Sequence, residues 1–229
     1  MSRADALGAA THPSEVSSIK RFILILAPLA LLGTTYAAFN GFVNLFGLQT
    51  GYLLGFLFKW IFWCLLIPLL IVGVDGLRSM FRSTDPPVGR PSWLGWLLLT
   101  IPLLLAYGYA FPRVLPYATA TVILLSLLIA IINGTLEEVF WRGTYVQIFP
   151  KQVIWGYLYP SLGFGLWHLA PQSVTGMSNP GGIISFVAVA TIFGLCWGWV
   201  AWRTGSIRWP VISHVLLDFA GFGALIYLR

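Results

Sequence analysis

YATATVILLSLLIAIINGTLEEVFWR (residues 117–142) is the stretch that decides the fold of this chain. Its apolar run from Tyr117 to Asn133 approaches the ~20 residues that cross a bilayer as an α-helix. Two adjacent glutamates, Glu137 and Glu138, follow soon after the run. A charged side chain in the middle of a bilayer costs about 2.5–3.5 kcal/mol on insertion scales, so these carboxylates need partners inside the protein. The stretch therefore predicts a membrane helix that carries a polar site.

The composition of the whole chain points the same way. Hydrophobic residues make up 58% of the 229 residues and charged residues only 9%, whereas about 25% of the residues in a soluble domain are charged. We predict an all-α, polytopic transmembrane helix bundle in a lipid bilayer. The net charge of +6 comes from basic residues scattered between the apolar stretches, which indicates loop topology rather than a nucleic-acid partner.

About seven spans fit the apolar stretches, with eight as the alternative count. Residues 1–19 are predicted to be a cytosolic tail, and residues 20–229 a single membrane-embedded helical domain. The expected spans are Phe22–Phe46, Tyr52–Val74, Trp93–Phe111, Tyr117–Ile148, Val153–Leu169, Ile183–Trp202 and Pro210–Leu228. Both cysteines, Cys64 and Cys196, fall inside spans, so no disulfide is expected.

The basic residues predict the orientation of the chain. Alternate loops on one side carry most of them: Lys20, Arg21, Arg78, Arg82, Arg90, Lys151, Arg203 and Arg208. The other side carries only Arg113 and the C-terminal Arg229. The positive-inside rule therefore places the N-terminus in the cytosol and the C-terminus outside. Lys59, inside the second span, is interpreted as a lysine that snorkels to the outer interface.

Three polar pieces lie on three different predicted spans. They are Glu137-Glu138-x-x-x-Arg142, Phe164-Gly165-Leu166-Trp167-His168 and His214-Val215-Leu216-Leu217-Asp218. Residues four apart share a helix face, which pairs Glu138 with Arg142 and His214 with Asp218. Glu137 points about 100° away from Glu138, so the two carboxylates need different roles. At 1.5 Å of helix per residue, all three pieces lie roughly 16–25 Å from the cytosolic side. We therefore expect them to meet in one pocket within the membrane.

Such a set of groups permits the activation of water. A carboxylate paired with a histidine can take a proton from water and later give it to a leaving amine. A second histidine and an Asp or Asn side chain can stabilise the oxyanion of a tetrahedral intermediate. The non-catalytic alternative is a buried ion-pair network that only holds the helices together.

Zinc is a second chemical option. Glu137, His168 and His214 would be its ligands, with an open position for water. The sequence contains no Gly-x-Ser-Gly nucleophile site, which argues against a serine mechanism. The three candidate zinc ligands come from three helices, and the sequence contains no local His-Glu-x-x-His zinc motif. We therefore favour metal-free chemistry and expect no cofactor, with zinc left open.

The three pieces, in this order, resemble the motifs of the CPBP family, which contains the CAAX proteases and bacteriocin-processing enzymes. The stretch from Thr204-Gly205-Ser206-Ile207 through Pro210 to His214 and Asp218 is similar to the last motif region of that family. The resemblance covers about residues 117–220. It implies a glutamate-dependent intramembrane endopeptidase, a class often described as metalloprotease.

The resemblance also implies a role for each residue. Glu137 would activate water together with His168. Glu138 and Arg142 would support that site, and His214 and Asp218 would form the oxyanion side. Many members of the family carry Asn at the position that Asp218 occupies in this sequence.

The expected function is hydrolysis of peptide bonds in a membrane-associated protein or peptide, by a multi-pass protein of a bacterial cell membrane. The alternative is a non-catalytic membrane protein for bacteriocin self-immunity or scaffolding. A proton-coupled transporter that uses Glu137 and His168 as a relay is a third possibility. The sequence leaves open the substrate, its prenylation and the oligomeric state.

Overall fold

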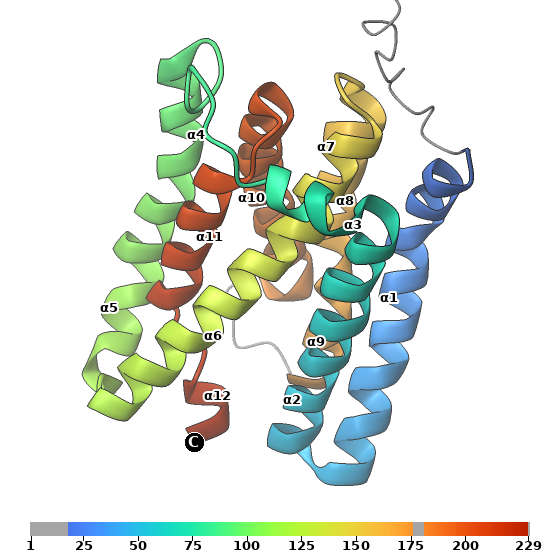
Figure 1. Ribbon diagram of the computed structural model, residues 1–229. Coiled ribbons are helices and arrows are strands. Elements are labelled where there is room, and N and C mark those ends of the chain that lie inside the picture. Colours follow the sequence, from blue (N-terminus) through green and yellow to red (C-terminus); the bar gives the residue numbers. More distant parts are fainter. Residues whose placement is uncertain (1–17, 176–180, 229) are drawn as a thin grey trace, which may run out of the picture.

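A computed structural model describes residues 18–175 and 181–228 of the protein (Figure 1). These residues form helices joined by short loops, with no strand among them. In lipid every backbone N–H and C=O group needs a partner within the protein, which an apolar chain provides by coiling into helices. The predicted class, an all-α polytopic bundle, is confirmed. Residues 1–17 of the predicted cytosolic tail lie outside the described residues.

Within the described ranges, six helical runs are long and apolar enough to cross a membrane. They are Ser18–Phe46, Leu48–Ser79, Ser92–Tyr117, Ala120–Ile148, Gly182–Thr204 and Arg208–Leu228. These runs occupy the positions of the first four predicted spans and of the last two.

Most of the runs consist of consecutive helical segments. In chain order the segments are α1 (Ser18–Phe46); α2 (Leu48–Phe58), the π-helical η1 (Lys59–Leu66) and α3 (Ile67–Ser79); α4 (Ser92–Leu105), the π-helical η2 (Ala106–Ala110), α5 (Phe111–Val114) and the 3-10 turn η3 (Leu115–Tyr117); α6 (Ala120–Glu138), the π-helical η4 (Val139–Thr144) and α7 (Tyr145–Ile148); the π-helical η5 (Ile154–Leu158), α8 (Tyr159–Trp167) and α9 (Leu169–Thr175); α10 (Gly182–Thr204); α11 (Arg208–Ala220) and α12 (Leu225–Leu228).

The fifth predicted span, Val153–Leu169, is built from shorter pieces. The segments η5, α8 and α9 follow one another, and the helix breaks at His168, between α8 and α9. Backbone hydrogen bonds continue on both sides of the break. His168 N donates to the Gly165 carbonyl, and Gln172 N donates to the His168 carbonyl, both at 3.2 Å. The break places a histidine at a helix end inside the bundle. A seventh membrane crossing by these pieces together stays a prediction.

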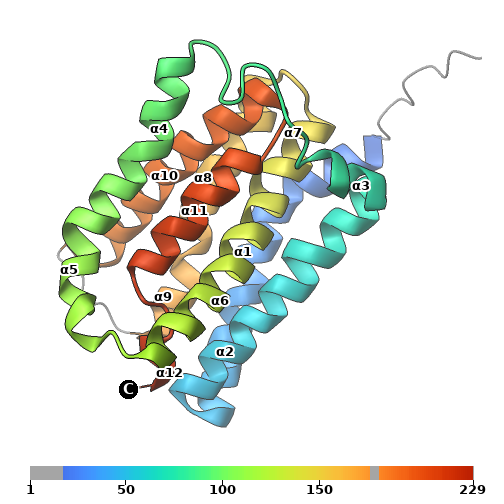
Figure 2. The same ribbon diagram turned by 60° about the vertical axis from the view of Figure 1, so that its left-hand side comes forward.

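Helices that are far apart in sequence pack side by side in the middle of the bundle. The helix α6 lies against α11, while α8 lies against α10 and α1 (Figures 1 and 2). Small residues allow membrane helices to approach closely, and Gly134 of α6 is such a residue. A Cβ atom on Gly134 would lie 3.0 Å from the backbone nitrogen of Val215 on α11. This approach brings the end of α6, with its two glutamates, next to α11.

The loops that carry most of the basic residues lie at one end of the bundle (Figure 1). Arg203 Nη2 donates to the Arg90 carbonyl and Arg208 Nη1 donates to Ser83 Oγ, both at 2.7 Å. These bonds tie the α3–α4 connection to the end of α10 and the start of α11. One basic end is the arrangement that the positive-inside rule requires, while the side of the membrane that it faces stays a prediction.

Candidate active site

The two glutamates lie where the helix changes type. The helix α6 ends at Glu138, and the buried π-helical turn η4 follows from Val139 to Thr144. Thr144 Oγ1 donates to the Val139 carbonyl oxygen at 2.8 Å and so satisfies a backbone acceptor inside this turn. Turns of this kind are frequent at functional sites. Glu137 and Glu138 are 1% and 0% exposed, and they face different partners, as their angular separation predicts.

Glu137 makes an ion pair with Lys59, which begins η1 on the neighbouring run. Glu137 Oε1 accepts a hydrogen bond from Lys59 Nζ. Lys59 is fully buried, and its Nζ lies 3.6 Å from the ring centroid of Trp167 and 5.4 Å from that of Phe56.

The interpretation of Lys59 as a snorkelling lysine is therefore wrong. Lys59 lies 11 residues (59 − 48) beyond the start of α2 at Leu48, which is about 16 Å of helix and more than a lysine stem can span. An ion pair inside the bundle removes the cost of leaving its charge in lipid.

Glu138 belongs to a second buried ion pair. Arg142 Nη1 donates to Glu138 Oε1 at 2.8 Å. The guanidinium carbon of Arg142 lies 4.1 Å from the ring centroid of Phe164 and 5.4 Å from that of Trp197. The pairing of residues four apart, expected from the sequence, is thus present at the junction of α6 and η4.

His214 lies between the two glutamates. Its Nδ1 is 2.8 Å from Glu138 Oε1, and its Nε2 is 3.5 Å from Glu137 Oε2. An ionised carboxylate can only accept, so Nδ1 carries a proton in the bond to Glu138. Trp197 stacks on the imidazole with the centroids 4.1 Å apart and the planes at 16°. The edge and the face of the ring are therefore both held in place.

Asp218 completes the cluster on α11. Its Oδ1 lies 3.5 Å from His214 Nε2, and its Oδ2 accepts a hydrogen bond of 2.8 Å from Asn133 Nδ2. Asn133 Oδ1 accepts a hydrogen bond of 2.8 Å from Trp60 Nε1, which fixes the direction of the amide. The side chain of Asp218 is 21% exposed, more than those of the two glutamates.

A cavity of about 430 Å³ opens beside these groups, and Glu137, His168 and Asp218 line it. His168 Nδ1 lies 2.8 Å from the Phe164 carbonyl oxygen, which can only accept. In the neutral ring Nδ1 therefore carries the proton and Nε2 is the basic nitrogen. Glu137 Oε2 is buried and makes no hydrogen bond within the described residues. Glu137 and His168 thus lie together at the cavity wall, and Glu137 Oε2 keeps its capacity to accept a hydrogen bond.

The six residues predicted for the site lie together in two layers. The first layer lines the cavity and consists of Glu137, His168 and Asp218. The second layer lies behind it and consists of His214, Glu138 and Arg142. The predicted meeting of three polar pieces from three helices is therefore what the structure shows.

Two polar residues of the site were missed from the sequence. The sequence pattern places Lys59 at the membrane interface and Asn133 at the end of an apolar run. The signal for both was available, because a polar side chain inside a membrane span is itself an indication of function. What the sequence did not supply was the partner of either residue.

The ion pair of Glu137 with Lys59 argues against a resident metal ion at this carboxylate. The ligand set considered from the sequence was Glu137, His168 and His214, but the ammonium group of Lys59 occupies Glu137 Oε1. A divalent cation there would be repelled by this neighbouring charge. Within residues 18–175 and 181–228, no group of three or more His, Cys, Asp or Glu side chains is arranged to hold a metal.

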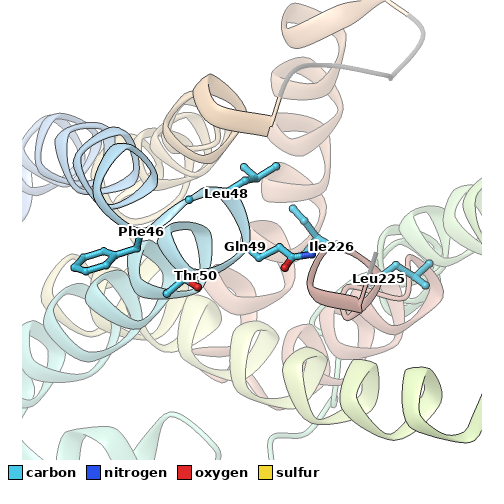
Figure 3. Close-up of a pocket in the computed structure, with 7 residues that line it drawn as sticks. Phe46, Leu48, Gln49, Thr50, Leu225 and Ile226 are labelled. Atoms are coloured by element: carbon cyan, nitrogen blue, oxygen red, sulfur yellow. The ribbon is translucent and has the colours of Figure 1, made fainter.

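A larger hollow, of about 660 Å³, lies between the α1–α2 turn and α12 (Figure 3). Its lining residues are Phe46, Gly47, Leu48, Gln49, Thr50, Leu225 and Ile226. None of these side chains is acidic, basic, a histidine or a cysteine, so this hollow offers no acid–base chemistry. The smaller cavity beside Glu137 is the candidate active site.

Comparison with known proteins points to the same part of the chain. Residues 119–220 match the family model described as Rce1-like, type II CAAX prenyl endopeptidase Rce1-like. No curated protein and no solved structure matches the chain. The matched segment contains all six predicted site residues and leaves out Lys59. The match supports the family indicated by the three sequence motifs.

Proposed function

Since residues 119–220 belong to the Rce1-like family of type II CAAX prenyl endopeptidases, we propose that this multi-pass membrane protein is an intramembrane endopeptidase. It hydrolyses a peptide bond of a membrane-associated protein or peptide, in a bacterial cell membrane. The observation that carries the proposal is the cavity wall, where Glu137, whose Oε2 makes no hydrogen bond within the described residues, lies with His168 and Asp218.

Glu137 is the general base of the proposed reaction. A water molecule held between Glu137 Oε2 and His168 gives its proton to the carboxylate as its oxygen attacks the substrate carbonyl carbon. The protonated Glu137 then gives this proton to the leaving amine, and the carboxylate is restored. His168 assists because its Nδ1–H is fixed on the Phe164 carbonyl, which leaves Nε2 to accept a hydrogen bond from the water.

His214 and Asp218 form the oxyanion side of the proposed site. His214 Nε2 and Asp218 Oδ1 lie 3.5 Å apart, which is close enough for both groups to face one substrate oxygen. Each of them donates to that oxygen only in its protonated form, because the Nδ1 proton of His214 already bonds Glu138 and an ionised carboxylate can only accept. Glu138 holds His214 through Nδ1, and Arg142 holds Glu138. Groups fixed in this way need no reorganisation when negative charge develops on the substrate.

The non-catalytic alternative, a protein for bacteriocin self-immunity or scaffolding, is compatible with the Glu138–Arg142 ion pair. It gives no reason for a cavity lined by Glu137 and His168. We propose the peptidase on this ground, and the chemistry is written without a metal because Lys59 already pairs with Glu137.

The test is cleavage of a quenched fluorescent peptide library by purified protein in detergent. The samples are wild type, Glu137→Gln, chelator-treated wild type and the matched control Asp75→Asn, an exposed carboxylate that pairs with Arg78 at 3.7 Å. We expect Glu137→Gln to lower kcat by about 10²–10⁴-fold, the usual contribution of a general base. Chelator and Asp75→Asn should leave the rate unchanged.

Cleavage by Glu137→Gln at the wild-type rate would overturn the assignment of the base. Loss of cleavage with chelator would favour zinc. If wild type cleaves no peptide, and Glu137→Gln and His168→Ala keep their biological activity, the non-catalytic alternative is the better account.

A further inference from the structure

We propose that Lys59 is a positioning residue of this site, a built-in cation that turns Glu137 so that one carboxylate oxygen faces the cavity. The inference rests on the proposed peptidase function and adds to it a residue outside the segment that matches the family model. Lys59 lies on η1, which the chain reaches 78 residues before Glu137.

The two oxygens of Glu137 have different surroundings. Oε1 accepts the hydrogen bond from Lys59 Nζ. Oε2 is buried, makes no hydrogen bond within the described residues, and lies 3.5 Å from His214 Nε2. The ammonium group therefore holds one oxygen and leaves the other for a water molecule. A carboxylate with two free oxygens could rotate about its last bond and lose this orientation.

Lys59 is itself held in place, as a positioning role requires. Its side chain is fully buried, so it cannot exchange its partner for bulk water. Its Nζ lies 3.6 Å from the Trp167 ring centroid and 5.4 Å from the Phe56 ring centroid. The two rings meet edge to face with centroids 6.0 Å apart. An ammonium group over an aromatic ring is attracted by the negative electrostatic potential of the ring face, so Glu137, Trp167 and Phe56 define three sides of the cation.

The charge balance of the cluster also supports a role for Lys59. Three acidic side chains, Glu137, Glu138 and Asp218, gather around one histidine. Arg142 pairs with Glu138 and leaves Glu137 without a guanidinium partner. Lys59 supplies a cation at Oε1 of Glu137. It therefore gives Glu137 a fixed positive neighbour without a metal.

The experiment compares Lys59→Met with the matched control Lys20→Met. Methionine keeps most of the volume of the lysine stem and removes the charge. Lys20 is a second lysine, whose Nζ donates to the Ile71 carbonyl at 2.6 Å, away from the cavity. With the library peptide that wild type cleaves best, we expect Lys59→Met to lose roughly 100-fold in kcat, the cost of a misplaced catalytic group, with KM near the wild-type value. Lys20→Met should keep both constants.

A second variant separates positioning from a merely structural role. Lys59→Ala removes the stem and the ammonium group, and propylammonium has the size and charge of what is missing. Phe56, Trp60 and Trp167 line the cavity. Lys59 Nζ lies over the Phe56 and Trp167 rings, so the space left by Lys59→Ala borders the cavity. We expect propylamine to raise the kcat of Lys59→Ala by about tenfold or more. Propanol, which has the same size and no charge, should leave the kcat of this variant unchanged. If Lys59→Met does not fold, Lys59→Ala purified in the presence of propylamine still tests the inference.

The outcomes separate this inference from the proposed function. If Glu137→Gln is inactive while Lys59→Met keeps the wild-type kcat, the positioning role is wrong and the peptidase stands. If propanol restores Lys59→Ala as well as propylamine does, Lys59 acts by filling space and the inference is overturned. If wild type cleaves no peptide, and Glu137→Gln and His168→Ala keep their biological activity, the proposed function fails and this inference fails with it.

Discussion

Asp218 is the site residue whose charge can be changed with the least change in shape. Asn133 donates its amide to Asp218 Oδ2, and the carbonyl oxygen of an asparagine could accept the same hydrogen bond. Its new NH₂ group could then face His214 and the substrate oxygen, as a permanent donor to an oxyanion. The role proposed for Asp218 therefore needs the hydrogen-bonding side chain, and not its charge.

We predict that Asp218→Asn cleaves peptide within about tenfold of the wild-type kcat, whereas Asp218→Leu loses 10²–10³-fold, the range for removing one oxyanion donor. The measurement is steady-state cleavage by the two variants, which have side chains of similar size. If Asp218→Asn were as inactive as Asp218→Leu, the carboxylate itself would be required and the oxyanion role would be wrong.

At the scale of elements, the site depends on how closely α6 approaches α11. A Cβ atom on Gly134 would lie 3.0 Å from Val215 N and 3.2 Å from Val215 Cα. These are backbone atoms, which cannot rotate away as a side chain can. The same contact sets the distance of the α6 residues Asn133 and Glu137 from the α11 residues His214 and Asp218.

Gly134→Leu should therefore push the two helices apart. We predict a loss of about 1–3 kcal/mol in unfolding free energy, as for other overpacked positions, and a loss of peptide cleavage, because the two halves of the site separate. Thermal unfolding in detergent and the cleavage rate measure the two effects. Gly33→Leu on α1 is the control, since no atom lies within 4 Å of a Cβ built there. Unchanged stability and activity in Gly134→Leu would contradict this account of the contact.

At the scale of the whole molecule, the basic loops at one end predict its orientation. Ser83 lies in the α3–α4 connection, and Gln49 lies near the α1–α2 turn at the opposite end; both are exposed (Figures 1 and 3). The native cysteines Cys64 and Cys196 are buried, so they add little background to cysteine labelling.

We predict that a membrane-impermeant maleimide labels Gln49→Cys in right-side-out vesicles. It should label Ser83→Cys only after the membrane has been opened, because the basic end faces the cytosol. The reverse pattern would place the N-terminus outside.

The helical class, the position of six membrane runs and the three polar pieces followed from the sequence. The physical reason is that the free energy of placing a segment in lipid is largely a sum over its own residues. The i, i+4 pair of Glu138 and Arg142 is likewise set by the helix repeat alone. The roles assigned to the six site residues remain predictions, although their common location could be expected from their similar depth.

Tertiary structure alone decided the partners. Lys59 lies 78 residues from Glu137, and Asn133 lies 85 residues from Asp218, so neither pair has a local signature. Residues four apart are neighbours on any helix, whereas residues on different spans become neighbours only when the helices pack. This is why the interpretation of Lys59 as a snorkelling lysine is wrong. A lysine inside a span extends toward the interface unless helix packing places an acidic side chain next to it, as it does with Glu137. The fifth predicted span is interrupted at His168, and packing places that histidine at the cavity beside Glu137.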